Sequence, residues 1–288
     1  MVLADCVRET LKNCAMAIPL LRKWRSHLGR TGPARPRGPD LDRFAFASLV
    51  EVLRTVESVR GLRVLELGPG DHLASGLSFL AAGAESYTAV EPFPGDYRGT
   101  NARAWYAAVR AAWHDRFPCM DWPPTLDVGS FPDLPGSAVL PCTIESAQNL
   151  KNLGTYHVIC SHYVGQHVAR IETLSRLTAQ HLCSGGVGVH KVGFGPQDCW
   201  ARYSDPFVFL RFSDRTWRLM GSNRAIPNRR RHHEFVNAFR EAGLRVQVRD
   251  VIGFQHEVHP STLAVRFRDM PRSSLGVKEV TYLVRPGI

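Results

Sequence analysis

The sequence lacks any uninterrupted run of about 18 apolar residues, the length that a membrane-spanning helix requires. Its short apolar stretch at 15–21 is followed at once by Arg22, Lys23 and Arg25, which is not the order of a secretory signal peptide. The hydrophobic fraction of 44% is ordinary for a protein with a buried core. These features predict a globular protein of the cytoplasm.

Closely spaced cysteines are also missing. The seven cysteines are scattered, their number is odd, and none is spaced as CxxC. Structural zinc sites and disulfide frameworks require tighter clusters. We therefore expect reduced, partly buried thiols and no bound metal.

Acidic residues are fewer than basic ones, 26 against 36, and the net charge is +10. Arginines concentrate at 22–37 and 224–231. A basic balance suits nucleic acid, anionic membrane surfaces or phosphorylated substrates. It is equally typical of solvated loops in an arginine-rich protein. We favour the second interpretation, so a nucleic-acid partner stays an alternative.

The order of the expected elements predicts an α/β fold. A basic, helical lead-in over 1–29 and a breaker-rich linker at 31–39 precede a helix at about 41–60, which Asp40 caps and Gly61 ends. Helices are then expected at 72–82, 103–117, 168–183 and 234–242, and strands at 63–67, 86–90, 138–144, 156–161, 186–192, 244–251 and 277–284. This alternation predicts a mostly parallel seven-stranded sheet with helices on both faces over 61–288, preceded by an N-terminal helical extension over 1–60.

The first strand ends in Glu66-Leu-Gly-Pro-Gly70. Ligands of a doubly wound sheet bind beyond the carboxyl ends of its strands. Gly68 and Gly70 tolerate positive φ and let a ligand approach the backbone, and the carboxylate of Glu66 could reach a positively charged group. The third glycine of a dinucleotide fingerprint and the lysine of a P-loop are both missing. Asp71 would also repel a pyrophosphate.

ELGPG after an apolar strand, with Glu91 at the end of the second strand, resembles motif I and the acidic ribose-binding position of class I, Rossmann-like S-adenosylmethionine-dependent methyltransferases. The resemblance covers roughly residues 60–195 and 232–252. It implies S-adenosylmethionine as the cofactor, with Glu91 accepting the two ribose hydroxyls. Ser146 stands where the family usually carries an acid near the adenine, and it could bond the exocyclic amine. The implied cofactor-binding residues are Glu66, Gly68, Pro69, Gly70, His72, Glu91, Pro92, Ser146, Ala147 and Ser161.

The segment after the fourth strand, Ser161-His-Tyr-Val-Gly-Gln-His-Val168, lacks the NPPY sequence of enzymes that methylate nucleobase amines. It is similar to the S/H-x-V-L-E-H-V pattern of small-molecule methyltransferases, with Gly165-Gln166 in place of Leu-Glu. Methyl transfer depends mainly on alignment, and a hydroxyl nucleophile also benefits from a base. The catalytic candidates are His162, His167 and His190, each of which could equally be a packed histidine. Tyr163 is a substrate-binding candidate.

An insertion at 195–231 holds six aromatic residues between positions 200 and 217. Its place beyond the fifth strand predicts a substrate lid, with Trp200, Arg202 and Tyr203 as binding candidates. A small helical unit that packs its own aromatic residues is the alternative.

These patterns together favour a methyltransferase of a small molecule, such as a secondary metabolite or glycoside in natural-product biosynthesis, and O-methylation with a histidine base. An RNA methyltransferase and a non-catalytic, cofactor-binding partner subunit are the alternatives. Residues 1–40 are compatible with closing over the site, with forming a homodimer or with touching an anionic membrane, and the sequence does not choose among these.

Overall fold

The computed structural model describes residues 2–18, 36–150, 153–196, 205–221 and 226–287. Its centre is a seven-stranded sheet in the order β3-β2-β1-β4-β5-β7-β6. The strands are β1 (Arg63–Leu67), β2 (Ser86–Val90), β3 (Ser137–Leu140), β4 (Tyr156–His162), β5 (Leu182–Gly193), β6 (Leu244–Gly253) and β7 (Val277–Pro286). β1 to β5 pair in parallel, and β7 lies antiparallel between β5 and β6. The predicted α/β, Rossmann-like sheet is confirmed.

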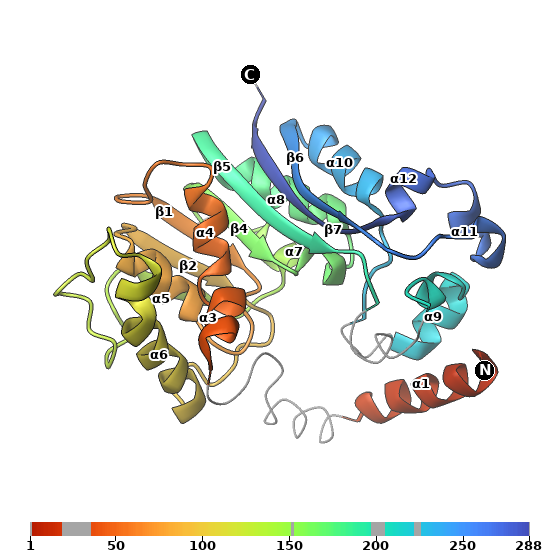
Figure 1. Cartoon of the computed structure of the whole chain (residues 1–288), viewed down its shortest axis with the longest axis horizontal. Coiled ribbons are helices and arrows are strands. Elements are labelled where there is room, and N and C mark those ends of the chain that lie inside the picture. Colours follow the sequence, from red (N-terminus) through yellow and green to blue (C-terminus); the bar gives the residue numbers. More distant parts are fainter. Residues whose placement is uncertain (1, 19–35, 151–152, 197–204, 222–225, 288) are drawn as a thin grey trace.

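Helices cover both faces of this sheet (Figure 1). One face carries α3 (Gly38–Phe44), α4 (Ala47–Leu53), α5 (Ala74–Ala81) and α6 (Thr100–Arg116), and the other carries α7 (Ile144–Ala147), α8 (Ile171–His181) and α10 (His232–Glu241). Burial on both faces explains why β1 reads as an almost unbroken apolar run. Glu66 interrupts that run.

The helix expected over 41–60 is two helices, α3 and α4, with a break at residues 45 and 46. At the break Phe46 is buried and packs edge-on against Trp113 and Phe117 of the α6 region. Leu41 of α3 and Leu49 of α4 belong to the same hydrophobic cluster as β1, β2 and β4. Residues 38–60, predicted to belong to the N-terminal extension, therefore pack in the same hydrophobic cluster as the sheet.

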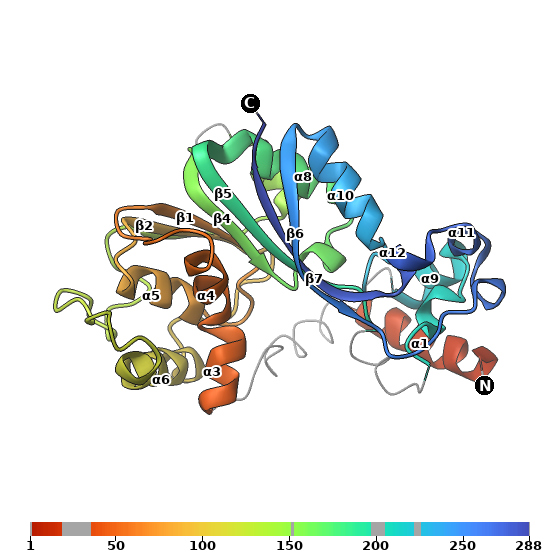
Figure 2. The same cartoon turned by 45° about the horizontal axis from the view of Figure 1, so that its top comes forward.

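A second, smaller hydrophobic cluster lies beside the sheet and forms what we call the cap: α1 (Val2–Met16), residues 205–221 and residues 254–276 (Figure 2). It contains the 3-10 turns η3 (Val208–Leu210) and η4 (Pro260–Thr262) and the helices α9 (Asp214–Gly221), α11 (Val265–Arg268) and α12 (Arg272–Leu275). The Asn13 amide of α1 donates to the Leu219 carbonyl at 2.9 Å. The part contributed by 254–276, between β6 and β7, was not expected from the sequence.

Two buried arginines stabilise the cap, and one of them joins it to the sheet. Arg229 donates to the carbonyls of Phe209 and Phe212 and pairs with Asp214. Arg231 is fully buried and donates to the Phe194, Leu275 and Val277 carbonyls at 2.8–3.1 Å. The guanidinium groups of Arg229 and Arg231 are thus buried and hydrogen-bonded inside the protein. Burial lowers the pKa of Arg231 to about 10, which leaves it charged at neutral pH.

None of the helices in the described ranges is long and apolar enough to cross a bilayer.

Candidate functional site

The turn after β1 is held open by two glycines in the left-handed region, Gly68 at φ +70° and Gly70 at φ +83°. The Gly68 amide donates to the Val90 carbonyl of β2 at 2.8 Å, which ties the turn to the neighbouring strand. A Cβ on Gly68 would lie 2.5 Å from a methyl group of Val164. Glycine is therefore required here both by the backbone angle and by the segment that follows β4.

Glu91 lies directly beside this turn, one residue beyond β2. Its carboxylate accepts the backbone amide of Gly70 at 3.0 Å and that of Phe93 at 2.9 Å. The side chain is only 8% exposed. The two motifs on which the family resemblance depends are thus brought into contact, with Pro69 and Pro92 half-buried beside them.

Glu66 does not face the ligand edge, which corrects the expectation that it reaches a charged ligand group. It is 3% exposed, and its oxygens accept the Tyr87 hydroxyl at 2.5 Å and the Ser48 hydroxyl at 3.3 Å. Burial, opposed by these hydrogen bonds, raises the pKa of its carboxyl. Glu66 therefore supports the turn from beneath and connects it to α4, which carries Ser48.

His72 lies at the start of α5, with its ring stacked on Trp105 at 4.0 Å between centroids. Burial lowers its pKa to about 4, so the imidazole is neutral at neutral pH. Nδ1 is placed to accept the Ala74 amide at 3.4 Å, which assigns the proton to Nε2. Nε2 is buried and has no hydrogen-bond partner among the described residues. A buried N–H of this kind is a donor that a bound ligand can satisfy.

Two tyrosines that the sequence analysis did not single out hold the glycine turn. The Tyr97 hydroxyl donates to the Gly70 carbonyl at 2.9 Å. The Tyr106 hydroxyl accepts the Leu73 amide at 3.3 Å and donates to the Tyr97 carbonyl at 3.1 Å. Both residues lie in the stretch after β2 that matches the family poorly. Aromatic enrichment at 97–113 was the only signal that could have identified them.

Ser161 and His190 face the core on the α8 side of the sheet. His190 is fully buried, its Nδ1 lies 2.9 Å from the Ser161 hydroxyl and its Nε2 lies 3.3 Å from that of Thr178. Burial lowers its pKa to about 3. The structure therefore gives His190 a packing role in place of the expected catalytic one, and Ser161 is its partner and not a surface for the cofactor.

Ser146 and Ala147 lie in α7, after β3. The Ser146 side chain is exposed and bonds to Thr143, which caps the helix. Ala147 is fully buried among apolar residues. Ala147 thus has no surface for an adenine ring, and the hydroxyl of Ser146 keeps its predicted position at the sheet edge.

His162 ends β4 on the same face as α4. Burial, together with the charges of Lys191 and Arg43, lowers its pKa to about 3. His167 lies half-buried in the 3-10 turn η1 (Gly165–His167). Tyr163 adopts φ +57°, unusual for a bulky residue, and its hydroxyl donates to Glu279 at 2.6 Å. His162 therefore lies at the carboxyl edge of the sheet, where the glycine turn also lies.

The replacement of Leu-Glu by Gly165-Gln166 has a packing reason. A Cβ on Gly165 would meet Phe235 and Val192 at 3.0 Å. Gln166 is buried, donates to the Tyr163 carbonyl at 2.8 Å and accepts the Gly193 amide at 3.4 Å. The segment after β4 is thereby fixed to the end of β5.

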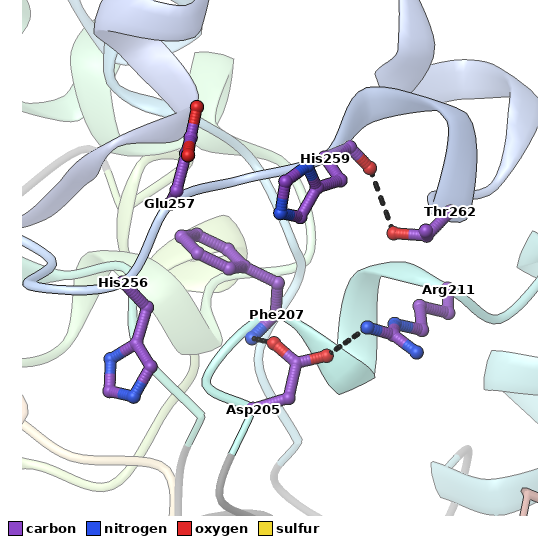
Figure 3. Close-up of a pocket in the computed structure, with 7 residues that line it drawn as sticks. All are labelled: Asp205, Phe207, Arg211, His256, Glu257, His259 and Thr262. Atoms are coloured by element: carbon purple, nitrogen blue, oxygen red, sulfur yellow. Dashed lines mark hydrogen bonds and ion pairs between the residues drawn. The ribbon is translucent and has the colours of Figure 1, made fainter.

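Trp200, Arg202 and Tyr203 lie outside the described residues. The other aromatic residues of the insertion, Phe207, Phe209, Phe212 and Trp217, are buried in the cluster of the cap. The cap also carries an open pocket of about 400 Å³ (Figure 3). Its lining consists of Asp205, Phe207, Arg211, His256, Glu257, His259 and Thr262.

A larger cavity of about 610 Å³ lies between the segment that follows β2 and β3. Its walls include Pro94, Asp96 and Tyr97 from the segment after Glu91, and Val139 and Pro141 at the end of β3. It is therefore next to the acidic position at the end of β2.

No protein-family model and no curated protein matches the chain. Solved structures with a similar fold include the YcgJ protein of Bacillus subtilis, at 12% identity and a TM-score of 0.47, covering 84% of this chain and 99% of that one. An S-adenosylmethionine-dependent methyltransferase of Mesorhizobium loti has 17% identity and a TM-score of 0.43, with 81% and 95% covered. One of Clostridium acetobutylicum has 11% identity and a TM-score of 0.43, with 83% and 89% covered.

Proposed function

We propose that this chain is an S-adenosylmethionine-dependent methyltransferase that acts on a small molecule. The observation that carries the proposal is the contact between Glu91 and the amide of Gly70, which joins an acidic strand end to a turn of two left-handed glycines. A carboxylate in that place can accept ribose hydroxyls, and the open turn lets the backbone approach a ligand.

The charges around the turn support a cationic ligand. Three acidic side chains lie next to the turn in sequence, in contact with it or beside Tyr97, which contacts it: Asp71, Glu91 and Asp96. Such surroundings oppose a pyrophosphate and favour a sulfonium. The buried Nε2–H of His72 is an unsatisfied donor beside the turn, and the carboxylate of S-adenosylmethionine is an acceptor. The residues present thus fit this cofactor.

The bound cofactor would supply an activated methyl group, and the chain has to align an acceptor with it. His162 is neutral at neutral pH and can accept a hydrogen bond from an acceptor hydroxyl. A proton on His162 would lie near Lys191 and Arg43, which disfavours the charged form. We therefore assign His162 to orienting the acceptor and to weak base catalysis, which suits an acceptor that is itself acidic.

The partners of the buried arginines bear on the RNA alternative. Arg229 and Arg231 are buried and hydrogen-bonded, and Arg230 pairs with Glu234 at 2.6 Å. These three cations are not presented to a phosphate backbone. A small-molecule acceptor, as in natural-product biosynthesis, is therefore the form of the proposal that we favour.

Calorimetry with S-adenosylhomocysteine tests the proposal, with NAD and ATP as controls. We expect the first ligand to bind and the two pyrophosphate-containing ligands not to. Absence of binding by both S-adenosylmethionine and S-adenosylhomocysteine would refute the proposal. Transfer of a labelled methyl group to bulk RNA, and not to small-molecule fractions, would refute the acceptor class.

A further inference from the structure

A row of polar side chains crosses four strands of the sheet. His162 of β4 pairs with Lys191 of β5, Lys191 pairs with Thr281 of β7, and Thr281 pairs with Arg249 of β6. Side chains of paired residues point to the same face and lie about 5 Å apart at Cβ. Val189 and Leu283, two residues along from Lys191 and Thr281, pack in the cluster that includes α4. The row therefore lies on the α4 face.

The position of the row relates it to the proposed methyl-transfer site. His162 is the last residue of β4, at the carboxyl edge where the glycine turn also lies. α4 packs against β4 and β5, and the Arg54 carbonyl at its end accepts the Arg249 guanidinium, while β5, β7 and β6 run on toward the cap (Figure 1). A molecule held on this part of the sheet would have one end next to His162.

Thr281, at the middle of the row, is fully buried, and its hydroxyl has no hydrogen-bond partner among the described residues. A buried hydroxyl without a partner is energetically unfavourable. On either side of it lie the half-buried Lys191 and Arg249. Among the described residues neither cation takes part in an ion pair: Lys191 lies 5.6 Å from the ring of Tyr163, and Arg249 donates to the Arg54 carbonyl and to Gln247.

The acidic groups near the row are already engaged. Glu279 accepts the Tyr163 hydroxyl at 2.6 Å, and Asp250 binds both guanidinium nitrogens of Arg54 at 2.8 and 3.1 Å. Two cations and one hydroxyl donor therefore occupy adjacent register positions on the α4 face, with no ion pair of their own among the described residues. A carboxylate, which has two acceptor oxygens, would satisfy all three groups.

We propose that Lys191, Thr281 and Arg249 form a subsite for a carboxylate of the methyl acceptor, which directs the rest of the acceptor toward His162. This inference rests on the proposed function and specifies its substrate class. The hydroxyl of Thr281 donates to the carboxylate, and the two cations neutralise it.

The test uses two probes of nearly equal shape, 4-hydroxybenzoate and 4-hydroxybenzamide, added to full-length protein saturated with S-adenosylhomocysteine. The readout is the dissociation constant of each probe by calorimetry. We expect the wild type to prefer the carboxylate by about tenfold, the size of one charge-assisted hydrogen bond. The Lys191→Met and Thr281→Val variants should each reduce that preference, and Lys191→Arg should restore most of it.

Arg245→Met is the matched control, because Arg245 lies on the same strand as Arg249, four residues away or about 13 Å. It should leave the preference unchanged. The inference is overturned if Lys191→Met keeps the full preference, if the wild type binds both probes equally, or if the carboxylate does not bind at about 10 mM, far weaker than typical substrate affinities. These failures leave the binding of S-adenosylhomocysteine intact, whereas loss of that binding overturns the proposed function itself.

Discussion

Replacing Gly68 with alanine tests whether the turn after β1 forms part of the cofactor-binding site. The new Cβ would lie 2.5 Å from a methyl group of Val164, and φ would stay at +70°. A left-handed backbone costs a non-glycine residue about 1–2 kcal/mol, and the overpacking adds about 1–3 kcal/mol. We expect Gly68→Ala to lower the free energy of unfolding by about 2–5 kcal/mol and to weaken binding of S-adenosylhomocysteine at least about tenfold.

The second substitution Val164→Ala separates the two costs. It removes the methyl groups that the new Cβ would meet, so the double variant should recover the overpacking part and keep the backbone part. A double-mutant cycle of urea denaturation measures the coupling, which should favour the double variant by about 1–3 kcal/mol. If the coupling is zero, the clash is not the cause. If Gly68→Ala binds S-adenosylhomocysteine like the wild type, the turn does not hold the cofactor.

Three further changes test other parts of the structure. Glu91→Gln should weaken S-adenosylhomocysteine binding about tenfold in calorimetry, since it removes the charge of the carboxylate that we propose accepts the ribose hydroxyls. Unchanged affinity would contradict this role of Glu91. His190 has a folded-state pKa of about 3, below its unfolded value, so its contribution to stability is present above about pH 6.5 and is lost as pH falls toward 3. His190→Gln should therefore reduce the loss of unfolding free energy between pH 6.5 and 5 by about 2 kcal/mol. An unchanged dependence of the unfolding free energy on pH would contradict the depressed pKa. Arg231→Met removes the donor from three buried carbonyls and should lower the free energy of unfolding by at least about 3 kcal/mol. Arg231→Lys should not restore this loss, because one ammonium group cannot reproduce the forked donors of a guanidinium. A lysine variant as stable as the wild type in urea denaturation would contradict this prediction.

Local sequence patterns predicted the strands of the sheet well, but not the break between α3 and α4 or the helices of residues 254–276. The strand at 63–67 and the helix that follows it could be inferred because apolar periodicity and glycine positions are local. The break at Phe46 could not, since it is set by packing against Trp113, far along the chain. Residues 254–276 were missed because their helices are a single turn each and show no periodicity.

The residues of the candidate site also fall into those that local patterns predict and those that they do not. Gly68, Gly70 and Glu91 follow directly from two strand ends, so their mutual contact could be predicted. The engagement of Glu66 by Tyr87 and Ser48 could not, because a buried strand residue and a ligand-facing one look alike in sequence. The row through Lys191, Thr281 and Arg249 depends on the register of three strands, which local patterns do not encode.

The insertion of β7 between β5 and β6 has a consequence for synthesis of the protein on the ribosome. β5 can pair on one side with β4 as soon as it emerges, but its other side is completed by a strand that is made after β6. Until then the newly made chain exposes an open strand edge rich in valine, and β6 has no neighbour at all. Such an edge is a template for pairing with other chains. The newly made chain therefore passes through a stage in which the open edge of β5 makes it prone to pair with other chains.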